Sequence, residues 1–182
     1  HVSSELVTKI KTEFSSYLND DDIIVTSSIA PCIQYLIDHD DASGASGKSI
    51  MLSVDSGGAF GEVNELSRYS LAEVLDSTGQ ARLVNIFANM RNMNMCVHRI
   101  HNHKVVFEKV RRLPYLHSVY NFEEAIGCAV MSIRGKIVQL PHLFLCRQSH
   151  PNQFYHSVDM YNWFTDKYWY SAFNLLELTA ID

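Results

Sequence analysis

The sequence predicts an α+β fold in which a helical N-terminal half packs on an antiparallel sheet formed by the C-terminal half. Two observations favour it. Up to about residue 92, apolar residues recur mostly at the three- and four-residue spacing of helices. From residue 96 onward, short apolar runs are separated by compact polar turns, as in antiparallel hairpins. Because helices come first and strands later, the order differs from that of βαβ units.

The length and composition are those of one globular domain spanning residues 1–182. A chain of 182 residues is of ordinary domain size and can bury a core without disulfides or metals. Charged residues make up only 19% of the chain, compared with about 25% in average proteins. So few charges argue against disorder and indicate that part of the surface is apolar and meets a partner.

The N-terminal half is predicted to contain four helices, at residues 6–18, 31–37, 62–76 and 80–92. The first follows a serine that can cap it, and its apolar residues lie on one face. The second begins at Pro31, a residue favoured in the first turn of a helix. A Thr-Gly pair separates the last two.

The C-terminal half is predicted to form two β-hairpins. The first pairs residues 96–100 with 104–110, and the second pairs residues 125–133 with 136–146. The tail at residues 154–178 is aromatic, and its pattern fits a strand or a helix. Apolar residues at the periodic positions of the predicted elements are expected to be buried together. These are Leu6, Ile10, Phe14, Leu83, Phe87, Ile126, Val130 and Ile137.

A polar segment at residues 38–49 is predicted to be an exposed loop between short strands at 23–25 and 50–54. Its last eight residues, ASGASGKS, resemble a loose form of the Walker A phosphate loop, in which backbone amides surround a phosphate and a lysine meets its charge. Acidic residues precede this segment and a strand follows it, which reverses the order that a phosphate loop needs. We therefore expect no nucleotide there.

Cysteine and histidine cluster once in the sequence, at Cys96, His98, His101 and His103. Structural zinc sites need about four ligands in a dedicated geometry, usually from two spaced pairs. No second pair stands at a matching spacing here. We therefore expect neither a metal ion nor another cofactor, and a phosphate-loop or metal-dependent protein is only the third hypothesis.

Charge is segregated along the chain, because residues 1–76 carry nine excess negative charges and residues 77–147 carry seven excess positive ones. The densest basic stretch has aromatic residues within it and can face the phosphates of a nucleic acid or an anionic membrane surface. The basic stretch can equally dock on the acidic residues 1–76 of the same molecule or of a neighbouring one. The proposed polyanion-binding residues are Arg99, Lys104, Lys109, Arg111 and Arg112.

Aromatic residues are concentrated near the C-terminus. Successive rings there must point in different directions, so at least one is expected at a surface or an interface. We therefore expect a homo-oligomer that forms through this segment. The predicted interface residues are Tyr161, Trp163, Tyr168, Trp169 and Tyr170.

An enzymatic alternative is a Cys/His hydrolase. Cys32 lies near the start of a predicted helix, where the helix dipole lowers the pKa of a thiol. A distant histidine such as His142, His150 or His156, oriented by a carboxylate such as Asp159, would complete the site. Nothing in the local sequence fixes this pairing, so whether the protein is an enzyme stays open.

The favoured hypothesis is a non-enzymatic assembly or interaction protein, such as a small viral structural or accessory protein. No apolar run approaches the roughly 18 residues that a membrane span needs. The four cysteines are widely spaced and form no CxxC pair. That usage indicates free thiols in a reducing, cytoplasmic compartment.

Overall fold

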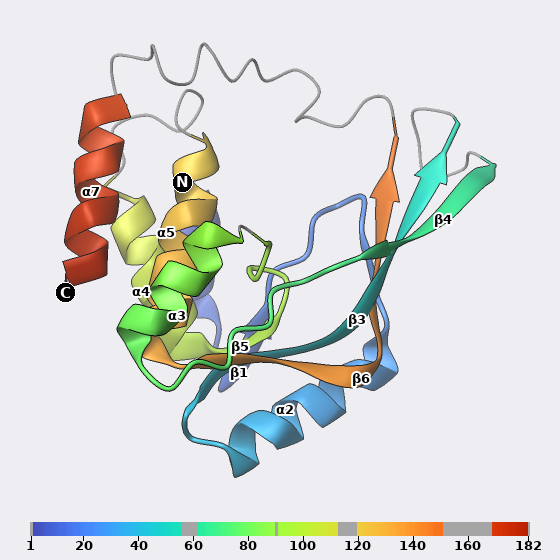
Figure 1. Cartoon of the computed structure of the whole chain (residues 1–182), viewed down its shortest axis with the longest axis horizontal. Coiled ribbons are helices and arrows are strands. Elements are labelled where there is room, and N and C mark those ends of the chain that lie inside the picture. The colour runs from blue at the N-terminus through green and yellow to red at the C-terminus, as the bar shows by residue number, and fades with distance from the viewer. Residues whose placement is uncertain (1, 56–61, 90, 113–119, 151–168, 182) are drawn as a thin grey trace.

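The computed structural model describes residues 2–55, 62–89, 91–112, 120–150 and 169–181. Helices and strands occur along the whole chain, and the strands form one six-stranded mixed sheet (Figure 1). In chain order the elements are α1 (Val2–Lys9), β1 (Phe14–Ser16), β2 (Ile23–Ile24), η1 (Thr26–Ser28), α2 (Ile29–Asp38), β3 (Ala42–Val54), β4 (Val63–Tyr69), α3 (Gly79–Ala88), β5 (Val97–Arg99), α4 (Ile100–Val110), α5 (Tyr120–Arg134), β6 (Lys136–Ser149) and α7 (Trp169–Ile181).

The α+β class is confirmed, but the predicted division into a helical N-terminal half and a C-terminal sheet is wrong. Four strands, β1 to β4, come from the N-terminal half, and the helices α4, α5 and α7 come from the C-terminal half. The sheet is also not purely antiparallel, because its two longest strands, β3 and β6, run parallel. The two halves of the chain therefore interleave in one sheet.

The sheet is organised around β3, which pairs along its length with β6, from Ala42 opposite Lys136 to Ser53 opposite Ser149. On its other edge, β3 pairs with β5 near its start and with β4 from residue 49 to its end. We call residues 42–47 the inner half of β3 and residues 49–54 its outer half. The outer half, β4 and residues 145–149 of β6 together form the strand arm, which extends away from the helices (Figure 1).

Helices cover the two faces of the inner sheet (Figure 1). On one face, α2 packs on the sheet, and a hydrophobic cluster there includes Cys32, Leu36 and Phe144. On the other face lie α3, α4 and α5, with α7 packed outside α5. The cluster beneath these helices includes Ile86 and Ile126. The inner half of β3 is therefore buried from both sides.

The predictions for residues 38–49 and 62–76 are wrong. Residues 38–49 were predicted to be a loop, but residues 42–49 are strand and nearly all buried. A Cβ atom on Gly47 would lie 2.2 Å from the carbonyl oxygen of His142, so small residues here permit close strand packing. The amides of this segment take part in sheet pairing, which is incompatible with a phosphate loop. The helix predicted at residues 62–76 is not formed, because residues 63–69 are the strand β4 and residues 70–76 are not helical.

Both predicted hairpins are also wrong. Residues 100–110 form α4 and residues 120–134 form α5. The buried side of α4 includes the polar residues Asn102 and His103, which conceal its helical period. The helix α5 contacts α3, α4 and α7, so it is apolar on several sides and lacks a clear one-face pattern. The second strand of the second hairpin is correct, as part of β6.

The predicted core is confirmed in part, since Ile126, Val130 and Ile137 are buried and Ile10, Phe14 and Leu83 are half-buried. Leu6 is 55% exposed and Phe87 is 38% exposed, so these two assignments are wrong. The first helix ends at Lys9, before its predicted apolar face is complete. In α3 the buried residues are Arg82 and Ile86, which shifts the predicted face by one position.

Candidate functional site

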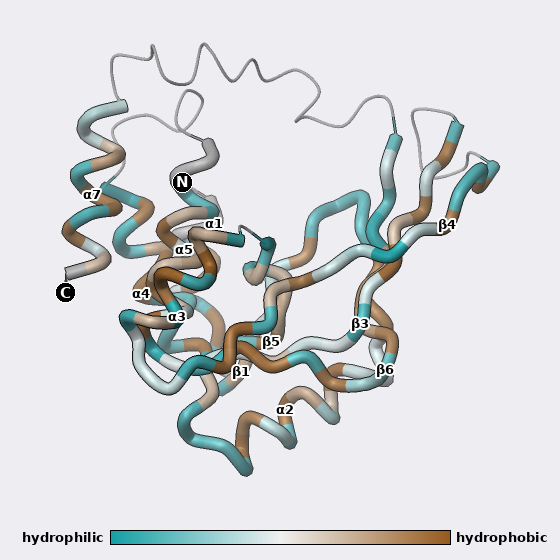
Figure 2. Tube along the Cα trace, in the orientation of Figure 1, coloured by the Kyte–Doolittle hydropathy of each residue, from teal (hydrophilic) through white to brown (hydrophobic). Residues whose placement is uncertain are grey.

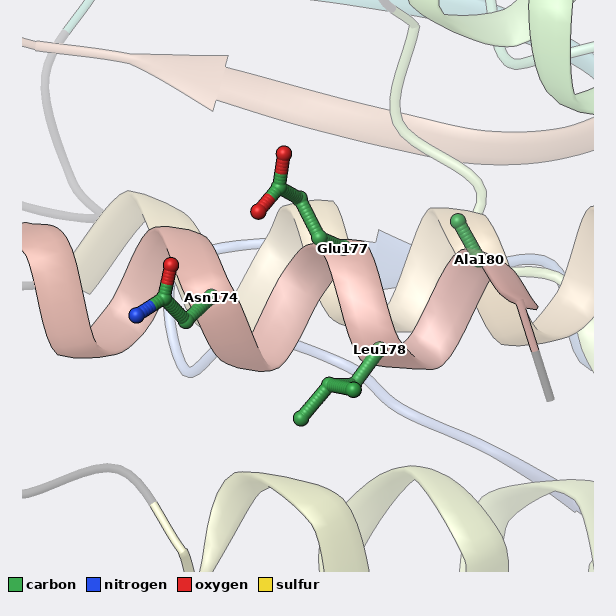
Figure 3. Close-up of a pocket in the computed structure, with 4 residues that line it drawn as sticks. All are labelled: Asn174, Glu177, Leu178 and Ala180. Atoms are coloured by element: carbon green, nitrogen blue, oxygen red, sulfur yellow. The ribbon is translucent and has the colours of Figure 1, made fainter.

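The helix α7 has a buried side and an exposed apolar side. Ala172 and Thr179 on the buried side are almost fully covered, and Trp169 packs against the core beneath the helices. On the other side Tyr170 is 75% exposed and Leu178 is 57% exposed. An open pocket is lined by Asn174, Glu177, Leu178 and Ala180 (Figure 3).

This exposed side is poor in charge, because Glu177 is the only charged residue between Trp169 and Ile181. The outer face of a surface helix is usually charged or polar. We call the set Tyr170, Phe173, Asn174, Glu177 and Leu178 the tail surface. Within the described part of the chain, no helix is both long enough and apolar enough to cross a membrane.

The predicted aromatic interface is only partly described. Tyr161, Trp163 and Tyr168 lie outside the described residues. The ring of Trp169 stacks on Phe173 at 5.0 Å and meets Tyr170 edge-on at 5.3 Å. Trp169 thus faces the core and supports the tail surface, whereas Tyr170 is available for contact.

The predicted basic stretch lies on β5 and α4, so its residues do not share one hairpin face. Arg99 is engaged within the fold: its guanidinium donates a hydrogen bond to the Leu36 carbonyl. It also lies 3.5 Å from the Asp40 carboxylate and 5.8 Å from the centre of the Phe14 ring. An Arg99 side chain held by these groups is poorly placed to bind an external polyanion.

The remaining cations are more accessible. Lys104, Arg111 and Arg112 are exposed, and their spacing places them along one side of α4 and its end. Glu108 lies on the same side and accepts a hydrogen bond from Arg112 at 3.0 Å. Lys109 is half-buried. We call Lys104, Arg111 and Arg112 the basic surface.

Cys32 is fully buried in α2. Burial raises the pKa of its thiol to about 11, opposite to the shift expected from the helix start. Desolvation therefore outweighs the helix dipole, and the reactive thiolate is not favoured at neutral pH. His156 and Asp159 lie outside the described residues. The structure thus gives the hydrolase alternative no support at the nucleophile.

Two histidines of the Cys/His cluster, His98 and His103, are buried and form a polar pair. The rings of His98 and His103 meet edge to face at 5.0 Å, and His103 Nδ1 lies 2.5 Å from Ser15 Oγ. His98 Nε2 lies 2.7 Å from the Met93 carbonyl oxygen, and its Nδ1 lies 3.1 Å from that of Ser43. The pair therefore joins β1, β5, β3 and α4.

This pair is not arranged for catalysis. Burial, aided by the charge of His98, lowers the pKa of His103 to about 3, and burial also lowers the pKa of His98. A base of such low pKa is too weak to activate Ser15 at neutral pH. Among the described residues, no group of three or more His, Cys, Asp or Glu side chains is placed to hold a metal ion.

A second polar cluster joins β4 to β6 within the strand arm and joins the arm to the segment before β2. Arg147 donates a hydrogen bond of 2.5 Å to the Tyr69 hydroxyl, and its guanidinium lies 5.0 Å from that ring's centre. Burial raises the pKa of Asp22 and of Glu124, and the charge of Arg147 opposes both shifts. Asp22 also accepts a hydrogen bond from the Gln148 amide at 3.1 Å. The partners come from β4, β6, α5 and the segment before β2, so no local motif marks them.

Comparison with known proteins does not assign this chain to a family. No protein-family model matches the sequence. No curated protein matches it either.

Proposed function

We propose that this protein is a non-enzymatic assembly protein that associates with copies of itself through the tail surface on α7. The observation that carries the proposal is the exposure of Tyr170 and Leu178 on a helix side with a single charge. Fully burying one such side chain contributes roughly 1.5–3 kcal/mol. A symmetric contact between two copies buries Tyr170 and Leu178 of both copies, so each contribution counts twice.

The tail surface is complementary to itself in an antiparallel arrangement. A two-fold axis at Asn174 places Tyr170 of one copy beside Leu178 of the other, since both are four residues from the axis. The same axis places Glu177 beside Ser171 of the second copy, so the acidic side chain does not meet its equivalent. The asparagines meet at the centre, where their amides can hydrogen-bond to each other.

Light scattering on purified protein tests this proposal. Tyr170→Asp should lower the mass in solution, because it places a charge in the contact. Val84→Asp is the matched control, since Val84 is an exposed apolar residue of α3 away from the tail surface. A wild type that stays monomeric at high concentration, or an unchanged mass for Tyr170→Asp, would contradict the proposal. Trp169→Ala is less informative because that ring supports the core.

A second candidate function, contact with nucleic acid, is favoured by the three exposed cations of the basic surface. Each phosphate contact contributes about 0.7–0.9 to the slope of log affinity against log salt. Arg111→Ala combined with Arg112→Ala should therefore weaken RNA binding and reduce that slope by roughly 1.4–1.8. Lys48→Ala, which removes an exposed cation of β3, is the control. Vesicles of anionic lipid test whether a membrane is preferred, and no binding of either ligand at low salt would refute this function.

We also propose a reducing, cytoplasmic location. All four cysteines are free thiols, and Cys32, Cys96 and Cys128 are buried in the core. Buried thiols without disulfide partners are typical of proteins that fold under reducing conditions. If so, refolding should recover more folded protein with reductant than without it. Equal recovery under both conditions would argue against the need for a reducing compartment.

A further inference from the structure

The strand β4 forms the outer edge of the strand arm. In the described part of the chain it pairs with β3 alone. Six of its seven residues are exposed, and Leu66 is 67% exposed. In Figure 1 the strand lies at the side of the molecule farthest from the helices. An exposed strand edge of this kind offers unpaired backbone groups to another strand.

The pairing register shows which part of this edge is regular. Val63 lies opposite Val54 and Glu65 lies opposite Ser53, so Asn64 is an extra residue, a β-bulge. From Glu65 to Tyr69 each residue has one partner in β3. These five residues form a straight run that can accept a further strand.

We propose that residues 65–69 pair antiparallel with the same residues of a second copy, about a two-fold axis at Ser67. An axis perpendicular to the sheet keeps each side chain on its own face. Opposed residues must therefore share a face, which requires the axis to pass midway between one residue and the same residue of the other copy. The possible registers are thus few, and each can be judged by the charges it opposes.

Only one of these registers uses the whole regular run without repulsion. An axis at Glu65 opposes two carboxylates, and an axis at Arg68 opposes two guanidinium groups, and both are unfavourable. An axis at Leu66 brings the bulged Asn64 into the ladder. The axis at Ser67 pairs all five residues and opposes no like charges. This self-complementarity favours a second copy over an unrelated extended segment.

The resulting side-chain pairs also cover the exposed leucine. Leu66 of each copy lies opposite Arg68 of the other, and the aliphatic part of an arginine can cover an apolar neighbour. Glu65 lies opposite Tyr69, which Arg147 holds in place from within its own chain. This contact is separate from the tail surface on α7. Two different two-fold contacts on one chain give a closed assembly such as a D2 tetramer when their axes intersect at right angles, and an open-ended one when the axes do not intersect.

A disulfide scan tests the axis directly. Ser67→Cys places two thiols opposite each other, so mild oxidation with oxidised glutathione should give a covalent dimer on a non-reducing gel. Glu65→Cys is the matched control, because its partner would be Tyr69 and not a second cysteine. Both positions are exposed. A dimer yield for Ser67→Cys no greater than that of wild type or of Glu65→Cys would overturn the proposal.

A charge exchange tests the pairing independently. In a Tyr170→Asp background, which removes the tail contact, Leu66→Lys sets a cation opposite Arg68 of the other copy. Dimerisation measured by analytical ultracentrifugation should weaken at least tenfold. Adding Arg68→Glu should restore it, because the introduced lysine then opposes a carboxylate. Circular dichroism checks the fold of each variant. Unchanged association for Leu66→Lys, or no recovery in the double substitution, would refute the register.

Discussion

The two halves of β3 differ in burial, and the difference is the opposite of what their hydropathy predicts. The inner half, ASGASG at residues 42–47, is made of small and polar residues and is buried throughout. The outer half, SIMLSV at residues 49–54, is largely aliphatic, yet four of its six residues are only half-buried. Figure 2 shows the contrast along the strand. Burial in this sheet therefore follows neighbouring elements and not side-chain polarity.

The neighbours explain the difference. The inner half lies between α2 and the helices of the opposite face, and Gly44 and Gly47 leave room for His98 and for the β6 backbone. The outer half extends beyond those helices as part of the strand arm (Figure 1). Small residues thus permit close packing in one half, while aliphatic residues remain available for contact in the other. Four predictions test this contrast.

Gly47→Ala is expected to have the largest effect. Its Cβ would meet a backbone oxygen of His142 at 2.2 Å and the Phe144 Cβ at 2.9 Å, so the backbone of β6 must shift. We expect the free energy of unfolding in urea to fall by about 3 kcal/mol. Ser53→Ala in the outer half is the control and should change it by less than about 0.5 kcal/mol. Similar small losses for both variants would show that the inner half is not tightly packed.

Stability should depend on pH through His103. Because its pKa falls from 6.5 to about 3 on folding, the unfolded chain binds more protons between these values. The contribution of His103 is therefore complete above pH 6.5 and is lost as the pH falls toward 3, by up to about 1.4 kcal/mol per pH unit. His103→Gln should flatten urea midpoints measured between pH 7 and 5. His101→Gln, at an exposed neighbour on the same helix, should retain most of the slope.

The sequence predicted the elements whose pattern agrees with their surroundings. The predicted helix at residues 31–37 corresponds to α2, which has Pro31 in its first turn. The predicted strand at residues 136–146 corresponds to β6, whose apolar run indicates a strand without help from distant residues. The inner half of β3 could not be predicted, because its burial depends on His142 and on helices distant in sequence. In α4 the buried Asn102 and His103 are polar, so the helical period was hidden.

Among the candidate sites too, local features were predicted and features set by distant residues were not. The exposed cations of the basic surface were predicted because lysine and arginine residues can be read directly from the sequence. The engagement of Arg99 within the fold was not predicted, because its partners, the Leu36 carbonyl and Asp40, lie some sixty residues away in the sequence. The strand edge at Leu66 was missed because residues 62–76 were predicted to be a helix. Pairing register is a tertiary property that local spacing does not encode.

Tyr69→Phe should loosen the strand arm while leaving the helices unchanged. It removes the hydroxyl that accepts the hydrogen bond from Arg147, at a cost of about 1 kcal/mol. Hydrogen exchange of the β4 amides should become faster, with little change in the amides of α5. Tyr35→Phe on α2 is the control and should leave β4 exchange as in wild type. Unchanged exchange in Tyr69→Phe would mean that the hydrogen bond from Arg147 does not help to hold β4 to β6.

Leu66→Thr is expected to have the smallest effect on stability. Most of the Leu66 side chain is already in water, and threonine suits a strand, so the unfolding free energy should change by less than about 0.5 kcal/mol. Leu145→Thr is the matched substitution in β6, where the leucine is fully buried, and should cost roughly 3 kcal/mol.

The comparison of these two leucines separates stability from contact. If Leu66→Thr preserves stability but weakens self-association, the leucine serves the surface of the strand arm and not its folding. A loss at Leu66 close to that at Leu145 would show instead that the leucine is covered in solution by another part of the chain. In that case the edge of β4 would not be open to a second copy. The two halves of β3 would then differ in how tightly they pack, and not in their availability for contact.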